Sequence, residues 1–263
     1  MAENLARLSL RSRLVSAVGD DWQGQFLMRH TRLAGVDVSA CSVLAGQATG
    51  TYVSLCNPDG SLLAAVNDMA VLDLLTPTEL ERHKALTSDA SAWVLDCNLS
   101  EAAIDWIMQS SAGKPVFVDG VSSHKCIKIL PHLARVNTLK INRLEAAALT
   151  GLPTDSTAQA IAAAHQLCER GAANVVVSLG SGGVCWASPT SHGHMAAIDI
   201  SVVNANGAGD ALTAGLVYGA LAGWPLAPAA RFANACAAVT MTCSGANHPD
   251  LSATRALQLL SDH

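Results

Sequence analysis

The residues best suited to chemistry form the stretch Gly207-Ala208-Gly209-Asp210, which precedes a segment rich in Ala, Leu and Gly at 211–223. That segment predicts a buried helix, so the turn would lie at a helix N-terminus, where free N–H groups and the helix dipole favour an anion. Glycines at 207 and 209 let the backbone approach a ligand closely. Asp210 would orient an attacking hydroxyl and accept its proton, which suits phosphoryl transfer. The alternative is a glycine-rich turn that Asp210 merely caps.

A second candidate is the stretch from Lys140 to Glu145, which follows a predicted strand at 136–141 and opens a predicted helix at 144–150. Asn142 and Glu145 are three residues apart and therefore share a helical face. Their oxygens could hold hydrated Mg²⁺, an ion that keeps several waters and is usually shared with phosphates. The same two residues also match a helix capping box, and the two interpretations are compatible.

A third candidate is the glycine-rich stretch 178–183, directly after a predicted strand at 174–179. It looks like a dinucleotide fingerprint, but such a fingerprint needs a helix next, and residues 184–187 are strand-like. We therefore discount NAD. A glycine turn at a strand end can still lie beside the phosphates or ribose of a nucleotide, or it can be a simple hairpin turn.

The first part of the chain predicts a strand at 14–18, a helix at 22–33 and two β runs at 51–56 and 62–66. The turn signal at 57–60 makes the two runs a hairpin. Asn67-Asp68 closes that hairpin, and its side-chain oxygens are good acceptors for sugar hydroxyls in a cleft. Asn and Asp are also ordinary turn formers, which is the alternative explanation.

The rest of the chain alternates apolar strands with helices, as in a parallel sheet covered on both faces, whose ligands lie at strand C-terminal ends. We predict one domain over residues 1–263, with a small β excursion at about 41–67. The further predicted elements are strands at 93–96 and 115–119, helices at 101–108 and 157–170, antiparallel runs at 183–187 and 195–200, and helices at 208–223, 228–243 and 251–260.

Composition excludes several classes of protein. Half of the residues are hydrophobic, 14% are charged, and the net charge of −5 is spread thinly, so we expect neither nucleic acid nor a membrane surface as a partner. The first residues do not form a signal peptide. The eight cysteines include no Cys-x-x-Cys pair, as expected for buried thiols in a reducing compartment, and we therefore expect a cytoplasmic protein.

Together these motifs resemble the ribokinase-like (phosphofructokinase-B type) family of ATP-dependent sugar and nucleoside kinases. The resemblance implies a three-layer α/β/α fold with a mostly parallel sheet and a small β lid. Within the family the chain looks most like the branch that phosphorylates pseudouridine, on the stretches 65–69, 96–101, 115–119, 138–145 and 247–252. The family motifs are matched in order at 16–20 with Gly24, at Asn142 and Glu145, at 178–183, at 207–210, and at 231–234 leading to 244–246.

The resemblance implies that Asp210 is the catalytic base acting on the 5′-hydroxyl and that Gly207, Ala208 and Gly209 form an anion hole. It implies that Asn142 and Glu145 organise Mg²⁺ and the phosphates of ATP. Further implied positions are Lys140, Ser178, Gly180, Gly182 and Asn206 for the nucleotide, Asn234 near the adenine, Asn67 and Asp68 for the nucleoside, and Asn204, Ala205 and 244–247 for a monovalent cation such as K⁺.

Two features depart from the family pattern. Asn206 stands where Thr or Ser usually precedes the glycine turn. Family members also open with a strand that carries a sugar-binding Asp, two lid strands and a Gly-Gly turn. Residues 1–8 match the interior of the first helix instead, so we expect that opening to be absent. The expected consequences are weak nucleoside binding, little or no kinase activity, and either low solubility or a homodimer that fills the gap. The alternatives are a kinase for another sugar or nucleoside, and a catalytically silent binding module.

Overall fold

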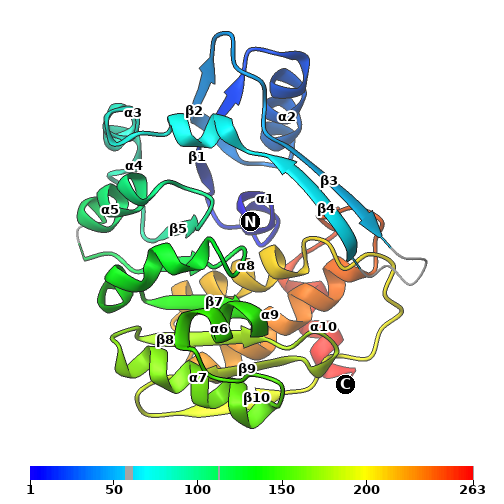
Figure 1. Ribbon diagram of the computed structural model, residues 1–263. Coiled ribbons are helices and arrows are strands. Elements are labelled where there is room, and N and C mark those ends of the chain that lie inside the picture. Colours follow the sequence, from blue (N-terminus) through cyan, green and yellow to red (C-terminus); the bar gives the residue numbers. More distant parts are fainter. Residues whose placement is uncertain (57–61, 112, 263) are drawn as a thin grey trace.

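The computed structural model describes residues 1–56, 62–111 and 113–262, so the predicted turn at 57–60 lies outside the described residues. Its central sheet is mixed, with the order β10-β9-β8-β7-β6-β5 (Figure 1). Neighbours from β5 to β8 are parallel, as predicted, and β9 and β10 are antiparallel additions, of which β9 was predicted at 183–187. The strands are β5 (Trp93–Asp96), β6 (Val116–Asp119), β7 (Thr138–Asn142), β8 (Asn174–Ser178), β9 (Val184–Ala187) and β10 (His192–Met195).

The prediction of a strand at 195–200 was wrong, because β10 ends at Met195. Met195 pairs with Val184, the first residue of β9, so the partner strand offers nothing further to pair with. Gly183, just before β9, has a φ of 84° and turns the chain away from the ladder.

Helices cover both faces of the sheet (Figure 1). The burial of alternate side chains of β8 agrees with this arrangement. Val175 and Val177 belong to the core under one helical layer, whereas Val176 faces the other. The architecture is therefore the predicted α/β fold in three layers. One layer contains α5 (Glu101–Ser110), η2 (Cys126–Arg135), α6 (Arg143–Thr150) and α7 (Thr157–Glu169), and the other contains α1 (Ala2–Arg7), α8 (Ala208–Leu221), α9 (Leu226–Met241) and α10 (Ala253–Ser261).

The remaining elements form a separate group, seen at the top of Figure 1. The strands β1 (Arg13–Gly19) and β2 (Asp37–Leu44) are parallel and are joined through α2 (Trp22–Leu33). The predicted hairpin is present as the antiparallel pair β3 (Thr51–Cys56) and β4 (Leu62–Asp68). The short helices η1 (Ala70–Leu74), α3 (Pro77–Arg82) and α4 (Lys84–Thr87) lead from it to β5.

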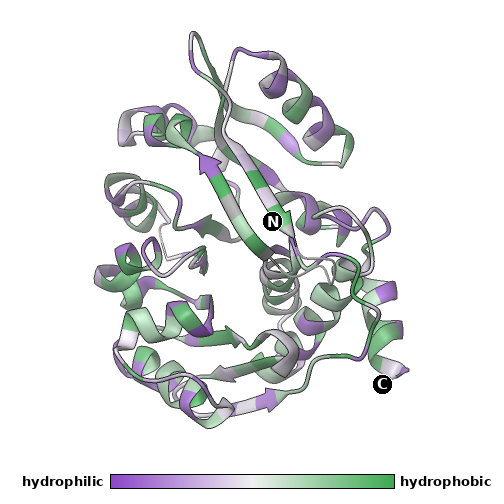
Figure 2. Ribbon diagram, turned by 45° about the vertical axis from the view of Figure 1, so that its right-hand side comes forward, coloured by the Kyte–Doolittle hydropathy of each residue, from purple (hydrophilic) through white to green (hydrophobic). Residues whose placement is uncertain are grey.

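The strand β2 was not among the predicted elements. The proposed excursion at about 41–67 starts inside this strand, which pairs with β1 and not with the hairpin. That residues 1–263 form one domain stays a prediction. Figure 2 shows apolar residues along both hairpin strands, and several of their large side chains are exposed, among them Tyr52, Val53, Leu55, Leu63 and Val66. No helix within the described part of the chain is long and apolar enough to cross a membrane.

Candidate active site

The turn at 207–210 lies at the N-terminus of α8, as the sequence predicts. Gly207 is the N-cap and has a φ of 82°, a conformation that favours glycine. Its Cα faces the backbone carbonyl of Ala246 so closely that a Cβ would overlap it. The side-chain amide of Asn204 donates to the carbonyl oxygen of Ser244 over 2.7 Å. The turn is therefore fixed against the loop at 244–247, next to the start of a helix whose first N–H groups have no intrahelical partner.

Asp210 lies in the first turn of α8, and 48% of its side chain is exposed. The ammonium group of Met1 lies 3.9 Å from its Oδ2 atom. The carboxylate is therefore accessible, and it is not buried against apolar side chains.

Lys140 brings a positive charge to the same turn. This residue of β7 is 8% exposed, and its Nζ lies 3.1 Å from Oδ2 of Asp119, at the end of the neighbouring strand β6. A Cβ built on Gly209 would lie 2.7 Å from that Nζ, so the ammonium group is directly against the turn. The C-terminal ends of β6 and β7 thus meet the N-terminus of α8.

Asn142 and Glu145 form the predicted capping box at the start of α6. The Asn142 side chain accepts from the Glu145 N–H at 3.0 Å, and Glu145 Oε2 accepts from the Asn142 N–H at 2.9 Å. Glu145 is 2% exposed and lies under Gly120, where a Cβ would come within 2.7 Å of Oε2. Burial raises the pKa of Glu145, the charge of Asp119 adds to this, and the Asn142 hydrogen bond and Lys140 oppose it.

A further carboxylate, Asp96, ends β5 beside Asp119, its register partner in β6. Burial raises the pKa of Asp96, and the charges of Asp119 and Asp210 raise it further, while the Asn98 N–H at 2.7 Å opposes the shift. The carboxylates of β5, β6, α6 and α8 therefore influence one another at one edge of the sheet. In the described part of the chain, no three His, Cys, Asp or Glu side chains gather closely enough to hold a metal ion by themselves.

The glycine loop at 178–183 follows β8 and lies beside the start of α6. The Ser178 hydroxyl donates to the carbonyl of Ile141 in the adjacent strand over 3.4 Å, and η3 (Gly180–Gly182) follows. A Cβ on Gly182 would lie 3.1 Å from Nη2 of Arg143, the residue after Asn142. The loop and the capping box are therefore neighbours.

Asn234 has a different environment. It lies in α9, is 7% exposed, and its Nδ2 donates to the carbonyl oxygen of Ala196 over 3.0 Å. The same 195–196 backbone lies against Gly183, since a Cβ on Gly183 would overlap it. Asn234 is thus separated from the glycine loop by the chain that follows β10.

The hairpin reaches the turn through Asn206. Its Nδ2 donates to the hydroxyl of Ser54 in β3 over 3.2 Å, and its N–H donates to Asn204 Oδ1 over 2.9 Å. Asn67 and Asp68, at the end of β4, are exposed, and Asp68 accepts from the Ala70 N–H at 3.1 Å. Residue 67 pairs with Tyr52 of β3 in the ladder. Among the described residues, no hydrogen bond joins either of them to the residues around α8.

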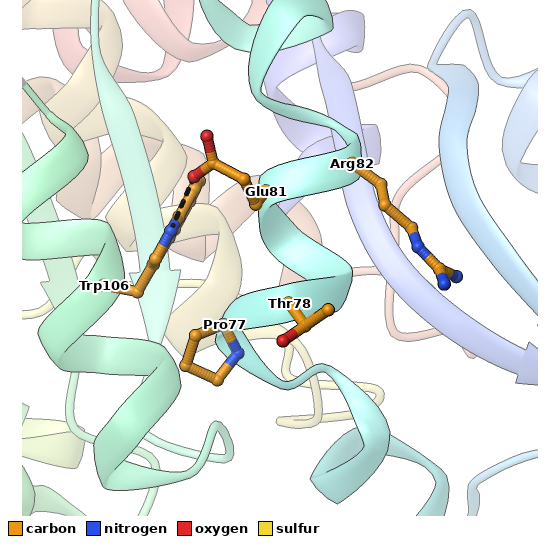
Figure 3. Close-up of a pocket in the computed structure, with 5 residues that line it drawn as sticks. All are labelled: Pro77, Thr78, Glu81, Arg82 and Trp106. Carbon is orange, nitrogen blue, oxygen red and sulfur yellow. Dashed lines mark hydrogen bonds between the residues drawn. The ribbon is translucent and has the colours of Figure 1, made fainter.

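A surface hollow of about 510 Å³ lies elsewhere, between α3 and α5 (Figure 3). Trp106 donates its indole N–H to Glu81 there over 3.0 Å, and none of the predicted site residues lines the hollow. Sequence reasoning did not assign Asp96, Asp119, Arg143 or Thr213 to the site. Asp96 and Asp119 end predicted strands, a position that could have revealed them.

The chain is similar to known proteins along almost its whole length. Residues 1–253 match the pfkB family of carbohydrate kinases. The chain is 38% identical over 263 residues to the pseudouridine kinase of Escherichia coli K12, covering all of this chain and 84% of that one. It is also 38% identical over 261 residues to the uncharacterized sugar kinase YeiI of Escherichia coli K12, covering 99% of this chain and 72% of that one. An E. coli ribokinase II structure, in complex with ATP and Mg²⁺, shares the fold, with a TM-score of 0.85 and 19% identity over 99% of this chain and 86% of that one.

Proposed function

This chain belongs to the pfkB family of carbohydrate kinases, and we propose that it transfers the terminal phosphoryl group of ATP to the 5′-hydroxyl of pseudouridine. As a member of the family it is a phosphotransferase that acts on an alcohol group of a sugar or nucleoside. The observation that carries the proposal is the position of the Gly207–Asp210 turn at the N-terminus of α8, directly against the ammonium group of Lys140. We take residues 1–263 as one catalytic domain.

In this proposal Asp210 orients the 5′-hydroxyl and accepts its proton as the oxygen attacks. The backbone N–H groups at Gly207, Ala208 and Gly209 hold the phosphoryl oxygens, where the helix dipole adds to their effect. Lys140 supplies a fixed positive charge beneath that turn, in a site where little reorganisation is needed during the reaction. Because 48% of its side chain is exposed, Asp210 can be reached by an acceptor that enters from solvent.

Asn142 and Glu145 are proposed to hold Mg²⁺ through its water shell and to orient the phosphates of ATP. The Glu145 carboxylate suits a hydrated Mg²⁺ ion. Each of its oxygens accepts one hydrogen bond from Asn142 and keeps a second lone pair, which can accept a hydrogen bond from a water bound to the ion. Bound Mg²⁺ neutralises charge on the phosphates during transfer. Buried under Gly120, the Glu145 carboxylate is preorganised for this role.

The nucleotide is proposed to lie along the loop at 178–183, beside the start of α6. Gly180 and Gly182 have no side chains, so they leave space for the nucleotide along this loop. The Ser178 hydroxyl is held in place by its hydrogen bond to the carbonyl of Ile141. Asn206 is proposed to lie beside the phosphates, and its hydrogen bond to Ser54 connects this part of the site to the hairpin. Asn234 is proposed to act near the adenine, with its Oδ1 as the group left for such a contact, since its amide nitrogen serves Ala196.

The acceptor is proposed to bind under the β3–β4 hairpin, with Asn67 and Asp68 facing the nucleoside. Identity of 38% over the whole chain to a pseudouridine kinase supports pseudouridine. The chain is also 38% identical to the uncharacterized sugar kinase YeiI, which supports a second candidate acceptor, a different sugar or nucleoside. We further propose that the enzyme is cytoplasmic. We also propose that it forms a homodimer, in which the exposed apolar side chains of the hairpin would be buried between the two subunits.

A monovalent cation such as K⁺ is proposed to bind near Asn204, Ala205 and the loop at 244–247. Support comes from the Asn204 amide, which fixes the two loops side by side through Ser244. Comparing turnover in K⁺ with turnover in tetramethylammonium at constant ionic strength tests this proposal. Equal rates would exclude it.

The acceptor is tested with ATP, Mg²⁺ and a panel of pseudouridine, uridine, adenosine, ribose and fructose. Uridine is the matched control, because it differs from pseudouridine in the glycosidic bond and the N–H pattern of the base. We expect kcat/KM for pseudouridine to exceed that for every other acceptor by at least about tenfold, as a hydrogen-bonding site discriminates. Preference for a free sugar would select the second candidate.

A further inference from the structure

Two residues outside the predicted site hold the side chain of Lys140 in place. Asp119 of β6 contacts Lys140 Nζ with both oxygens, Oδ2 at 3.1 Å and Oδ1 at 3.4 Å. The hydroxyl of Thr213 in α8 donates toward Asp119 Oδ2 over 2.8 Å and lies 3.1 Å from the carbonyl oxygen of Gly209. The three side chains thus connect β6, β7 and the first turns of α8.

All three residues are buried: Lys140 is 8% exposed, Asp119 5% and Thr213 1%. A buried ion pair is weak evidence for stability, because taking two charges out of water costs about as much as their attraction returns. A packed apolar cluster would hold two strands and a helix together as well. The charges therefore call for an explanation other than holding the fold together.

The position of Nζ supplies that explanation. It lies 2.7 Å from where a Cβ on Gly209 would be, so any larger residue at 209 would collide with it. An ammonium group has three donors, and one carboxylate does not use all of them. The Asp119 carboxylate fixes the Lys140 side chain from one side, and the Thr213 hydroxyl fixes the carboxylate. The ammonium group is thereby kept against Gly209 at the helix N-terminus.

We propose that Asp119 and Thr213 are positioning residues, which hold the Lys140 ammonium beneath Gly209 where the phosphoryl group is held during transfer. This inference rests on the proposed function. Thr213 acts through Asp119, and Asp119 acts through Lys140. Neither needs to touch the nucleotide or the acceptor.

The test measures binding of ADP–Mg²⁺ by calorimetry with and without aluminium fluoride, which mimics the transferred phosphoryl group. Thr213→Val keeps the shape of the side chain and removes its hydroxyl. We expect it to weaken binding of the fluoride complex by roughly tenfold, as for other residues that orient a binding group, and to leave ADP binding unchanged. Thr213→Ser should restore the affinity. Asp119→Asn should lose roughly 10–100-fold.

Thr240→Val is the matched control. Thr240 is equally buried in α9, and its hydroxyl donates to the carbonyl of Cys236 four residues earlier, over 3.0 Å. This variant should bind both ligands as the wild type does. Wild-type affinity for the fluoride complex in Thr213→Val, or an equal loss of ADP and of the complex, would overturn the inference. Turnover of the wild type with the acceptor panel is measured separately and reports on the proposed function alone.

Discussion

The Cα of Gly207 faces the backbone carbonyl of Ala246 at a distance that leaves no space for a side chain. Gly207 begins the turn at the N-terminus of α8, and Ala246 belongs to the loop after α9, so this contact joins two segments distant in sequence. The shape of the proposed anion site therefore depends on a backbone-to-backbone contact that only glycine permits.

Gly207→Ala is expected to distort the turn and abolish most kinase activity. Its Cβ must displace the Ala246 carbonyl, and its φ of 82° costs about 1–2 kcal/mol for an L-residue. Gly223→Ala is the control, because Gly223 also has a positive φ, 75°, but open space around it. Both should lower the melting temperature, and only Gly207→Ala should lose activity beyond that. Equal activity in the two variants would contradict the proposed anion site.

The hydrogen bond between Asn206 and Ser54 predicts that the hairpin helps to hold the acceptor. Ser54→Ala removes this bond, whose loss is worth about 0.5–1.5 kcal/mol, so the acceptor KM should rise roughly two- to tenfold. The KM for ATP should stay near its wild-type value. Ser88→Ala, which removes an exposed hydroxyl bonded within α4, is the control. An unchanged acceptor KM would show that the hairpin does not act through this contact.

Most of the fold could be predicted because its signals are local. Runs of apolar β-branched residues such as 174–179 indicate buried strands, and the glycine-rich turn at 207–210 indicates that a helix begins there. The strand β2 was missed because Ser39, Cys41 and Ser42 interrupt its apolar residues, and its burial depends on pairing with β1.

A contact within the site could be predicted where both of its residues belong to one short motif, as in the capping box of Asn142 and Glu145. Asp119 was not assigned to it, since its partners Lys140 and Thr213 lie 21 and 94 residues away in the sequence. The bond from Asn206 to Ser54 spans 152 residues, and no local pattern indicates it. Contacts of this kind depend on how the layers pack.

Glu145→Gln is expected to separate stability from activity. Gln can still accept the bond from the Asn142 N–H, but its NH2 group then faces Asn142 Nδ2, which donates to Oε1 in the wild type. Removal of the buried charge and loss of this second bond act in opposite directions, so the melting temperature at pH 7 should change little. The Mg²⁺ concentration for half-maximal rate should rise roughly 10–100-fold, as for lost ligand support. Glu145→Ala, which also loses the capping box, should be less stable than Glu145→Gln. Unchanged Mg²⁺ dependence in Glu145→Gln would contradict the proposed metal role.

The ion pair between Arg13 and Asp37 predicts a pH-dependent contribution to stability. The hydrogen bond from Arg13 lowers the pKa of Asp37 from its ordinary 3.8 to about 2. A lowered carboxyl pKa stabilises the fold above pH 4, and this stabilisation is lost as the pH falls toward 2. Both side chains are partly exposed, so Asp37→Asn should cost only about 0.2–1 kcal/mol at pH 7.

Urea unfolding of the wild type and Asp37→Asn at pH 7, 4 and 3 measures this contribution. The difference in unfolding free energy between the two proteins should be nearly complete at pH 7 and should shrink at pH 3. A difference that is constant or larger at pH 3 would be inconsistent with the ion pair as its source.

Proton transfer by Asp210 at the N-terminus of α8 is tested by one comparison of turnover. Steady-state rates with ATP–Mg²⁺ and the preferred acceptor are measured for the wild type, for Asp210→Asn, and for Asp89→Asn as a control at an exposed carboxylate paired with Arg13. We predict that Asp210→Asn lowers kcat by roughly 10²–10⁴-fold with little change in the KM for ATP, while the control is unaffected. Near-normal turnover in Asp210→Asn would contradict the account.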